Sequence, residues 1–302
     1  KYNLMDRHVQ AMNAAVPTFF QWDDHEVVNN WSDAKDLSDD DRYTEKSVRL
    51  LAARAGRAFH EMTPISYQPA EPGRVYRKIA YGPHLDIFFI DLRSYRGPNT
   101  TGMQTEMTDE SRVLGAEQIA WLKRELAMSK ATWKVIASDM PIGLNVWDKA
   151  KAGRFVEAIA NGDPGPAKGR ELEIADILRF IKTAGVKNTV WLTADVHYTA
   201  AHYYDPNKAA FQDFEPFWEF VSGPIHAGTF GPNDLDGTFG PDVRFVKAPT
   251  QEQGANLPPS MGLQFFGLVD IDGATGQMTV RLMDRADNEL WKTTLDPKRA
   301  AL

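Results

Sequence analysis

The chain has 302 residues, a formal net charge of −7, no cysteine and a hydrophobic share of 43%. The acidic balance argues against a general nucleic-acid binder, which would carry a basic stripe, and no apolar run reaches the ~18 residues that a membrane-spanning helix needs. The absence of cysteine excludes disulfides, thiolate metal sites and cysteine nucleophiles.

Helices and strands are expected to alternate along the first 198 residues. Apolar runs of β-forming residues predict strands that are buried on both faces, and apolar residues at helical spacing predict helices between them. In chain order, the expected elements are a helix over 3–15, a strand over 16–22, a helix over 45–62, a strand over 84–90, a helix over 116–128, a strand over 132–137, a helix over 171–184 and a strand over 188–193. This alternation is typical of an α/β layer fold.

The sequence changes in character after residue 198. Residues 213–259 are rich in glycine, proline and aromatic residues and have little helical period, which predicts a functional loop system. Residues 264–271 and 277–283, joined by a DGATG turn, predict a β-hairpin, and residues 289–295 predict a further strand. Because no repeat or low-complexity linker interrupts the chain, a single domain is expected.

Polar residues follow each of the four apolar runs predicted as buried strands. The four groups are Asp23-Asp24-His25-Glu26, residues 91–96, Ser138-Asp139 and Asp195-Val196-His197. In open α/β sheets, ligands bind outside the carboxyl ends of the strands. We therefore expect these four groups to converge on one site.

The residue types in these groups are those of a metal site that binds an anion. Asp24, Asn29 and Asp195 offer the oxygen ligands that hard or borderline cations prefer. Arg93 or Arg96 beside such metals would bind phosphate or another anionic group. The sequence therefore predicts metal-assisted chemistry on an anionic substrate.

Two histidines, His25 and His197, lie in the same groups and are candidates for stabilising or protonating a leaving oxygen. Taken alone, these residues have ordinary structural explanations, since an aspartate after a strand is often a turn cap and Asp91 with Arg93 would form a salt bridge between loops. The acidic run at 38–41 is expected to be a solvated loop, although acidic loops also hold calcium. His202 is expected to be structural, and no function is expected for His8, His60 and His84.

Other catalytic classes fit the sequence poorly. It has no GxSxG elbow, which argues against an α/β-hydrolase triad. It has no GxxxxGK[ST] loop, and no GxGxxG follows a predicted strand, which argues against nucleotide-phosphate binding.

The polar groups resemble the motifs of a known family. Residues 21–31, QWDDHEVVNNW, resemble the WDDHExxxNNW hallmark of the PhoD-like alkaline phosphatases, which are metallophosphatases with a calcineurin-like core. Residues 91–96 resemble the DxRxxR segment of that family, and residues 194–198 resemble its GDVHY segment, with Ala194 where glycine is usual. Residues 217–230 are similar to its EFVSGP loop, so the resemblance extends over essentially the whole chain in the right order.

The resemblance implies a fold, an activity and a role for each candidate residue. The implied fold is an α/β calcineurin-like metallophosphatase sandwich of two mixed β-sheets flanked by helices. The implied activity is hydrolysis of phosphomonoesters or phosphodiesters, with iron and calcium or other divalent metals, in the periplasm or outside the cell. The implied roles are metal ligation by Asp24, Asn29 and Asp195, positions beside the phosphate for His25 and His197, and a substrate or structural role for Arg93.

Two further expectations concern the extent of the chain. In the family, an early strand with a metal ligand and a GDxxY-type segment precede the WDDHE motif, and neither occurs here. Residues 1–302 are therefore expected to form the C-terminal two-thirds of one PhoD-like catalytic domain whose N-terminal strands are missing. The alternative is a non-catalytic fragment or binding module, in which the aromatic-rich region 211–230 binds a ligand or partner.

Overall fold

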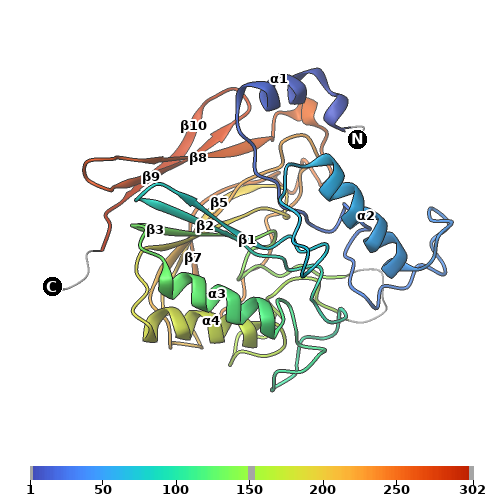
Figure 1. Cartoon of the computed structure of the whole chain (residues 1–302), viewed down its shortest axis with the longest axis horizontal. Helices are drawn as coiled ribbons and strands as arrows, with labels where there is room; N and C mark the ends of the chain where they lie inside the picture. Colours follow the sequence, from blue (N-terminus) through green and yellow to red (C-terminus); the bar gives the residue numbers. More distant parts are fainter. Residues whose placement is uncertain (1–2, 149–153, 299–302) are drawn as a thin grey trace.

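The computed structural model describes residues 3–148 and 154–298. A seven-stranded sheet forms the middle layer. Helices α3 (Ala116–Met128) and α4 (Glu171–Thr183) cover one of its faces, and a three-stranded sheet packs on the other (Figure 1). The described helices are too short or too polar to cross a lipid bilayer.

The large sheet is mixed, with the strand order β1-β2-β3-β4-β6-β5-β7. Its strands are β1 (Arg77–Tyr81), β2 (Leu85–Phe89), β3 (Trp133–Ala137), β4 (Thr189–Thr193), β5 (Thr199–Tyr204), β6 (Phe217–Val221) and β7 (Pro241–Lys247). β2, β3, β4 and β6 are parallel neighbours in that order, whereas β1, β5 and β7 pair antiparallel with their neighbours. The four parallel strands therefore end at the same edge of the sheet.

The small sheet has the order β10-β9-β8 and is antiparallel throughout. Its strands are β8 (Phe265–Ile271), β9 (Met278–Asp284) and β10 (Glu289–Leu295). The resemblance implied two mixed sheets, so the expectation is wrong for this second sheet. The hairpin and the further strand predicted from the sequence are confirmed.

Alternation along the central strands creates the two cores. Ile136 of β3 packs toward the helices, with Leu122 of α3 and Ile177 of α4, while its neighbour Val135 packs toward the small sheet with Val280 of β9. Successive side chains of a strand point to opposite faces, so a strand between two layers must be apolar at nearly every position. The apolar runs predicted as strands at 84–90, 132–137 and 188–193 correspond to β2, β3 and β4.

The N-terminal part contains a third, smaller core. After the 3-10 turn η1 (Asn3–Met5), Asp6 caps α1 (Arg7–Ala15) by accepting from the backbone N–H of His8 at 2.8 Å. This cap divides the helix that was expected over 3–15. Helix α2 (Val48–Met62) is capped by Ser47 and contributes Val48 to a cluster of buried side chains. That cluster consists of Trp22, Val28, Trp31, Leu37, Val48 and Val75.

The predictions of a strand over 16–22 and of a continuous loop over 213–259 are wrong. Residues 17–23 form neither helix nor strand and pair with no strand among the described residues. Pro17 has no backbone N–H, and β2 is already paired on both sides by β1 and β3, so no free edge is available there. Within 213–259, β6 and β7 find partners distant in sequence, while the short helix η2 (Pro259–Met261) follows.

Candidate active site

Polar side chains follow three parallel strands and lie at one edge of the large sheet. Arg93 follows β2, Asp139 follows β3 and Asp195 follows β4. Backbone hydrogen bonds join the last two turns, because the N–H of Ala194 donates to the carbonyl of Asp139 at 3.0 Å. This convergence agrees with the topological expectation for parallel strand ends.

The fourth polar group reaches the same edge without a strand. The side-chain amide of Gln21 donates to the carbonyl of Ile90 at 2.6 Å and to the carbonyl of Ala137 at 3.2 Å, at the ends of β2 and β3. A side chain thus replaces the missing strand pairing and holds residues 21–24 over the ends of both strands. Asp23 and Asp24 follow directly, so the predicted convergence occurs although the predicted strand does not form.

Asp23, Asp24 and Asp195 form a compact group of carboxylates. One oxygen from each lies within 4.8 Å of the others. Burial raises the pKa of Asp24, although the nearby Arg93 opposes the shift, and burial with the charge of Asp23 raises the pKa of Asp195. The backbone N–H of Asn30 donates to Oδ2 of Asp24 at 2.7 Å and fixes that side chain.

Arg93 is the cation of this group, and its side chain is fully buried. Its guanidinium donates to Asp23 at 2.6 and 2.9 Å and to Asp139 at 2.9 Å, contacts Asp195 at 3.4 Å, and also binds Glu157. Because it is enclosed by these acids, Arg93 acts on them rather than on a solvent-exposed ligand. This favours the structural role over the substrate role left open by the sequence.

The salt bridge considered between Asp91 and Arg93 does not form. Oδ1 of Asp91 instead accepts from the backbone N–H groups of Arg93 and Ser94, both at 2.9 Å. Asp91 therefore caps the turn that leads from β2 to Arg93, which is the usual use of an aspartate in this position.

A second layer of buried polar residues supports Arg93. Glu157 joins Arg93 to Arg96, whose Nη1 lies 3.1 Å from Oε1 of Glu157. Burial alone would raise the pKa of Glu157, but Arg93 and Arg96 hold it at about 2. Arg170 then donates to the backbone carbonyl of Glu157 at 2.7 Å and to Oδ1 of Asn99 at 2.8 Å. Glu157 therefore stays ionised and locks the orientation of the Arg93 guanidinium.

The turn after β4 has an unusual backbone. Asp195 and His197 have φ angles of 60° and 61°, in the left-handed region that non-glycine residues seldom occupy. Nδ1 of His197 lies 2.6 Å from the carbonyl oxygen of Gly228, and a carbonyl can only accept, so Nδ1 carries a proton. In the neutral His197 ring, Nε2 therefore carries the unprotonated lone pair and can accept a hydrogen bond or a proton. Strained residues of this kind gather at functional sites.

The remaining predicted residues, His25 and Asn29, lie at the margin of the group. Nε2 of His25 is 3.9 Å from Oδ1 of Asp24, and the His25 side chain is 71% exposed. Asn29 is exposed and lines a cavity of about 420 Å³ with Lys35 and Asp148, and among the described residues it makes no hydrogen bond to the aspartates. The structure thus brings Asp24, Asp195 and Arg93 together, keeps His25 adjacent and leaves Asn29 outside these contacts.

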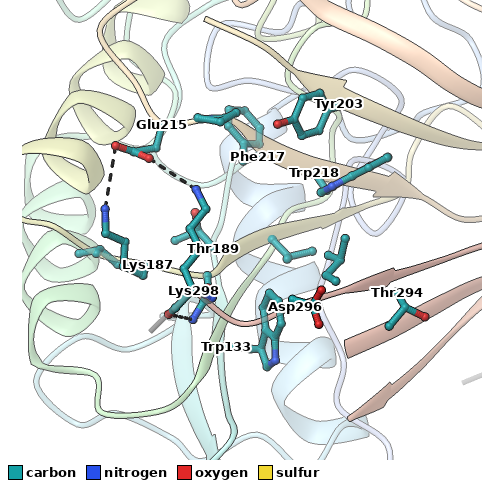
Figure 2. A pocket seen from close by; sticks show the side chains of 15 residues that line it. Trp133, Lys187, Thr189, Tyr203, Glu215, Phe217, Trp218, Thr294, Asp296 and Lys298 are labelled. Carbon is teal, nitrogen blue, oxygen red and sulfur yellow. Dashed lines mark hydrogen bonds and ion pairs between the residues drawn. The ribbon is translucent and has the colours of Figure 1, made fainter. Parts of the chain in front are cut away.

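Another cavity lies away from the carboxylates. It has a volume of about 230 Å³ and is lined by residues at the start of β3, β4 and β6, the edge opposite the carboxylates (Figure 2). Its lining holds two lysines and two acids, Glu215 and Asp296, so these charges balance; Glu215 lies 4.0 Å from Nζ of Lys187 and 3.5 Å from Nζ of Lys298. This cavity lacks the converging acids of the first site, so we assign the chemistry to the carboxyl edge.

The carboxylate group fits a metal ion. Asp23, Asp139 and Asp195 all contact the guanidinium of Arg93, which Glu157 shares with Arg96, and no described donor reaches the buried Oδ1 of Asp139. Buried carboxylates without a compensating charge are costly, and a bound cation would offset that cost. Oxygen donors of this type suit hard and borderline cations.

Sequence reasoning placed Asp23 and Asp139 in the groups expected to converge but named neither as a metal ligand, and it missed Glu157 altogether. For Asp139 a signal was present, because it follows a predicted buried strand in the same way as Asp195. Glu157 lies in an irregular segment, where no local pattern predicts its contact with Arg93 across 64 residues of chain.

Comparison with known proteins identifies the relatives of this chain. A family model described as PhoD-like phosphatase matches residues 1–282. The chain belongs to this family. Membership confirms the resemblance that the WDDHE and DVHY segments indicated.

Two relatives give the extent of the family likeness. Alkaline phosphatase D of Bacillus subtilis (strain 168) is 32% identical over 238 residues, which are 75% of this chain and 39% of that protein. The solved structure described as that of PhoD matches 96% of this chain and 54% of its own, with a TM-score of 0.60 and 21% identity. The second match shows that the fold is shared, and this chain spans about two-fifths of the curated family member and about half of the solved one.

Proposed function

We propose that this chain carries a metal-dependent active site that hydrolyses phosphate esters. The observation that carries the proposal is the group of Asp23, Asp24 and Asp195, which lies at the carboxyl edge of the parallel strands. Membership of a phosphatase family supports this reaction and does not favour a non-catalytic binding module.

Asp23, Asp24 and Asp195 would hold the metal, with Asp139 close by and Asn29 as a further candidate. When bound, such an ion supplies a hydroxide at neutral pH and positive charge for phosphoryl oxygens. Iron and calcium are proposed from the family resemblance, and other divalent metals suit the same oxygen donors.

The chain's own residues contribute orientation and proton handling. Arg93 holds Asp23, Asp139 and Asp195 close together although their charges repel one another, so the site is pre-organised before a metal binds. His197 has Nδ1 fixed by Gly228, so Nε2 accepts a proton and, once charged, donates to a leaving oxygen. The exposed ring of His25 has room to approach an ester from the solvent side.

The substrate is proposed to be a phosphomonoester or a phosphodiester of a small organic alcohol. The proposed location is the periplasm or the exterior of the cell, and it rests on the family resemblance alone. Cell fractionation with an antibody against the chain tests the location.

Neutral variants of the aspartates test the proposed reaction. We expect Asp24→Asn and Asp195→Asn to lower hydrolysis of a chromogenic monoester and a chromogenic diester on the order of a hundredfold, as is typical of losing one positioned electrostatic group. Asp109→Asn is the matched control, because the Asp109 side chain is 92% exposed. Equal rates in all three variants and the unmutated chain would contradict the assignment.

A further inference from the structure

An aromatic ring lies directly against His197. The ring centroids of Phe230 and His197 are 5.4 Å apart, with an interplanar angle of 62°. Phe230 is nevertheless 40% exposed, so the ring presents apolar surface to solvent on the side that His197 does not cover. Ile225 of the same loop is 77% exposed and adds to its apolar character.

The position of this ring is fixed by its own loop. The backbone N–H of Phe230 donates to the carbonyl of His197 at 3.3 Å, and the carbonyl of Gly228 accepts from the His197 ring at 2.6 Å. Thr229 pairs with Leu257 in an isolated β-bridge. At Gly231 the φ angle is 83°, and a Cβ would lie 2.4 Å from the Tyr198 ring, so the chain leaves the loop through a closely fitted position.

The loop also lies at the correct edge of the sheet. β6 is parallel to β4, and the N–H of Ser222, directly after β6, donates to the carbonyl of Thr193 at 3.0 Å. The loop that carries Phe230 therefore starts beside the turn that carries Asp195. The carboxylate group itself is polar, and the phenyl ring supplies apolar surface directly beside His197.

We propose that Phe230 is a specificity-determining residue that contacts the organic group of the ester and favours aromatic or otherwise apolar alcohols. The inference rests on the proposed function, because that function places the phosphate of the ester beside His197. The alcohol of the ester would then lie beside the Phe230 ring. A rigid, partly exposed ring loses little freedom when it binds another apolar group, which makes such contacts efficient.

Paired substrates that differ only in their alcohol test the proposal. Phenyl phosphate and glycerol phosphate, or the corresponding methyl diesters, would be compared in the unmutated chain, Phe230→Ala and Phe230→Leu. We expect Phe230→Ala to lower kcat/KM for the phenyl ester about tenfold more than for the glycerol ester, in line with the loss of apolar contact area. Phe230→Leu is expected to recover part of this difference.

An exposed aromatic ring away from the site serves as the control. Tyr81→Ala removes an exposed aromatic side chain, 70% accessible, at the end of β1, and should leave both substrates unchanged. Equal losses for the phenyl and glycerol esters in Phe230→Ala would contradict the proposal, since the ring would then act only by positioning His197.

A binding measurement separates this proposal from the proposed function. Calorimetry with phenylphosphonate and methylphosphonate needs no turnover, so it remains informative if the unmutated chain hydrolyses neither ester and the proposed function fails. We expect Phe230→Ala to weaken phenylphosphonate about tenfold and methylphosphonate little. Equal affinities of the unmutated chain for the two phosphonates, or an equal loss of both in Phe230→Ala, would overturn the inference.

Discussion

At the scale of single residues, Arg93 is the buried cation around which the acids of the site gather. Its buried guanidinium contacts four acids, Asp23, Asp139, Glu157 and Asp195. A buried ion pair contributes little net stability compared with apolar packing, but removing one partner leaves the others without compensation. Arg93 therefore determines both the stability of the carboxylate group and the distances within it.

Truncation of Arg93 is predicted to be strongly destabilising. Arg93→Ala should lower the free energy of unfolding by about 3–5 kcal/mol, because Asp23, Asp139 and Asp195 lose the arginine that contacts them. Urea denaturation followed by circular dichroism measures the change. Arg42→Ala is the control, since Arg42 pairs with Asp40 at the surface with a side chain that is 76% exposed. If both variants unfold at the same urea concentration, the structural role of Arg93 is wrong.

Glu171 is a buried acid outside the site, and it predicts a pH dependence. Burial, with the neighbouring Asp236 as the next cause, raises the pKa of Glu171 to about 8 from an ordinary value of 4.5. The folded chain thus retains a proton that the unfolded chain releases, so stability falls as the pH rises between these two values.

The variant Glu171→Gln lacks this titration. Between about pH 5 and pH 8, the unfolding free energy of the unmutated chain should therefore fall relative to that of Glu171→Gln, by up to roughly 1.4 kcal/mol per pH unit. The control is Glu61→Gln, because Glu61 is 52% exposed. An offset between the unmutated chain and Glu171→Gln that stays constant over this range would rule out the raised pKa.

At the scale of elements, the turn after β3 depends on a buried acid of β6. Oε1 of Glu219 accepts from the N–H of Ile142 at 2.8 Å, and Oε2 accepts from Nδ1 of His202 at 3.0 Å and from the Tyr204 hydroxyl at 2.8 Å. Glu219 thereby ties β5 and β6 to the segment that follows Asp139. It also explains why His202, to which no catalytic role was given, is buried on β5.

Replacing this carboxylate should loosen the turn. Glu219→Leu leaves three buried donors without an acceptor, so the unfolding free energy should fall by about 3 kcal/mol or more. Glu289→Leu, at an exposed position of β10, should change it by less than about 1 kcal/mol. Thermal unfolding of the two variants distinguishes them, and similar melting temperatures would refute the role of Glu219.

The elements also reveal which features the sequence could predict. β2, β3 and β4 were predictable because both of their faces are largely buried, which makes them apolar at most positions. β1 was missed, because this edge strand contains no fully buried residue, and so were β6 and β7, whose pairing depends on partners distant in sequence. The segment at 16–22 has the composition of a strand but is held by the side chain of Gln21.

The site was predictable to a similar extent. Arg93 and Asp195 come after buried parallel strands, and strand topology alone brings such residues together. Asp24 reaches them through the hydrogen bonds of Gln21, which the sequence did not predict. Glu157 and the support that Arg96 and Arg170 give it depend on irregular backbone, for which sequence has no short-range signal.

At the scale of the whole molecule, the three layers explain why the chemistry lies at one edge. The helices cover one face of the large sheet and the small sheet covers the other, so strand ends are where polar side chains can meet without entering a core (Figure 1). The cavity at the amino edge is lined by two lysines and two acids (Figure 2), whereas the acids at the carboxyl edge outnumber their arginine partners, Arg93 and Arg96. This imbalance is the physical basis of the proposed metal centre.

The most direct test of the account is a calorimetric metal titration of the unmutated chain, Asp24→Asn, Asp195→Asn and the control Asp109→Asn. Iron, calcium, manganese and zinc would each be added to metal-depleted protein. We predict binding by the unmutated chain and Asp109→Asn, and binding weakened at least tenfold in the two site variants, because each removes one carboxylate ligand. Binding of equal strength in all four proteins, or in none, would contradict the metal centre.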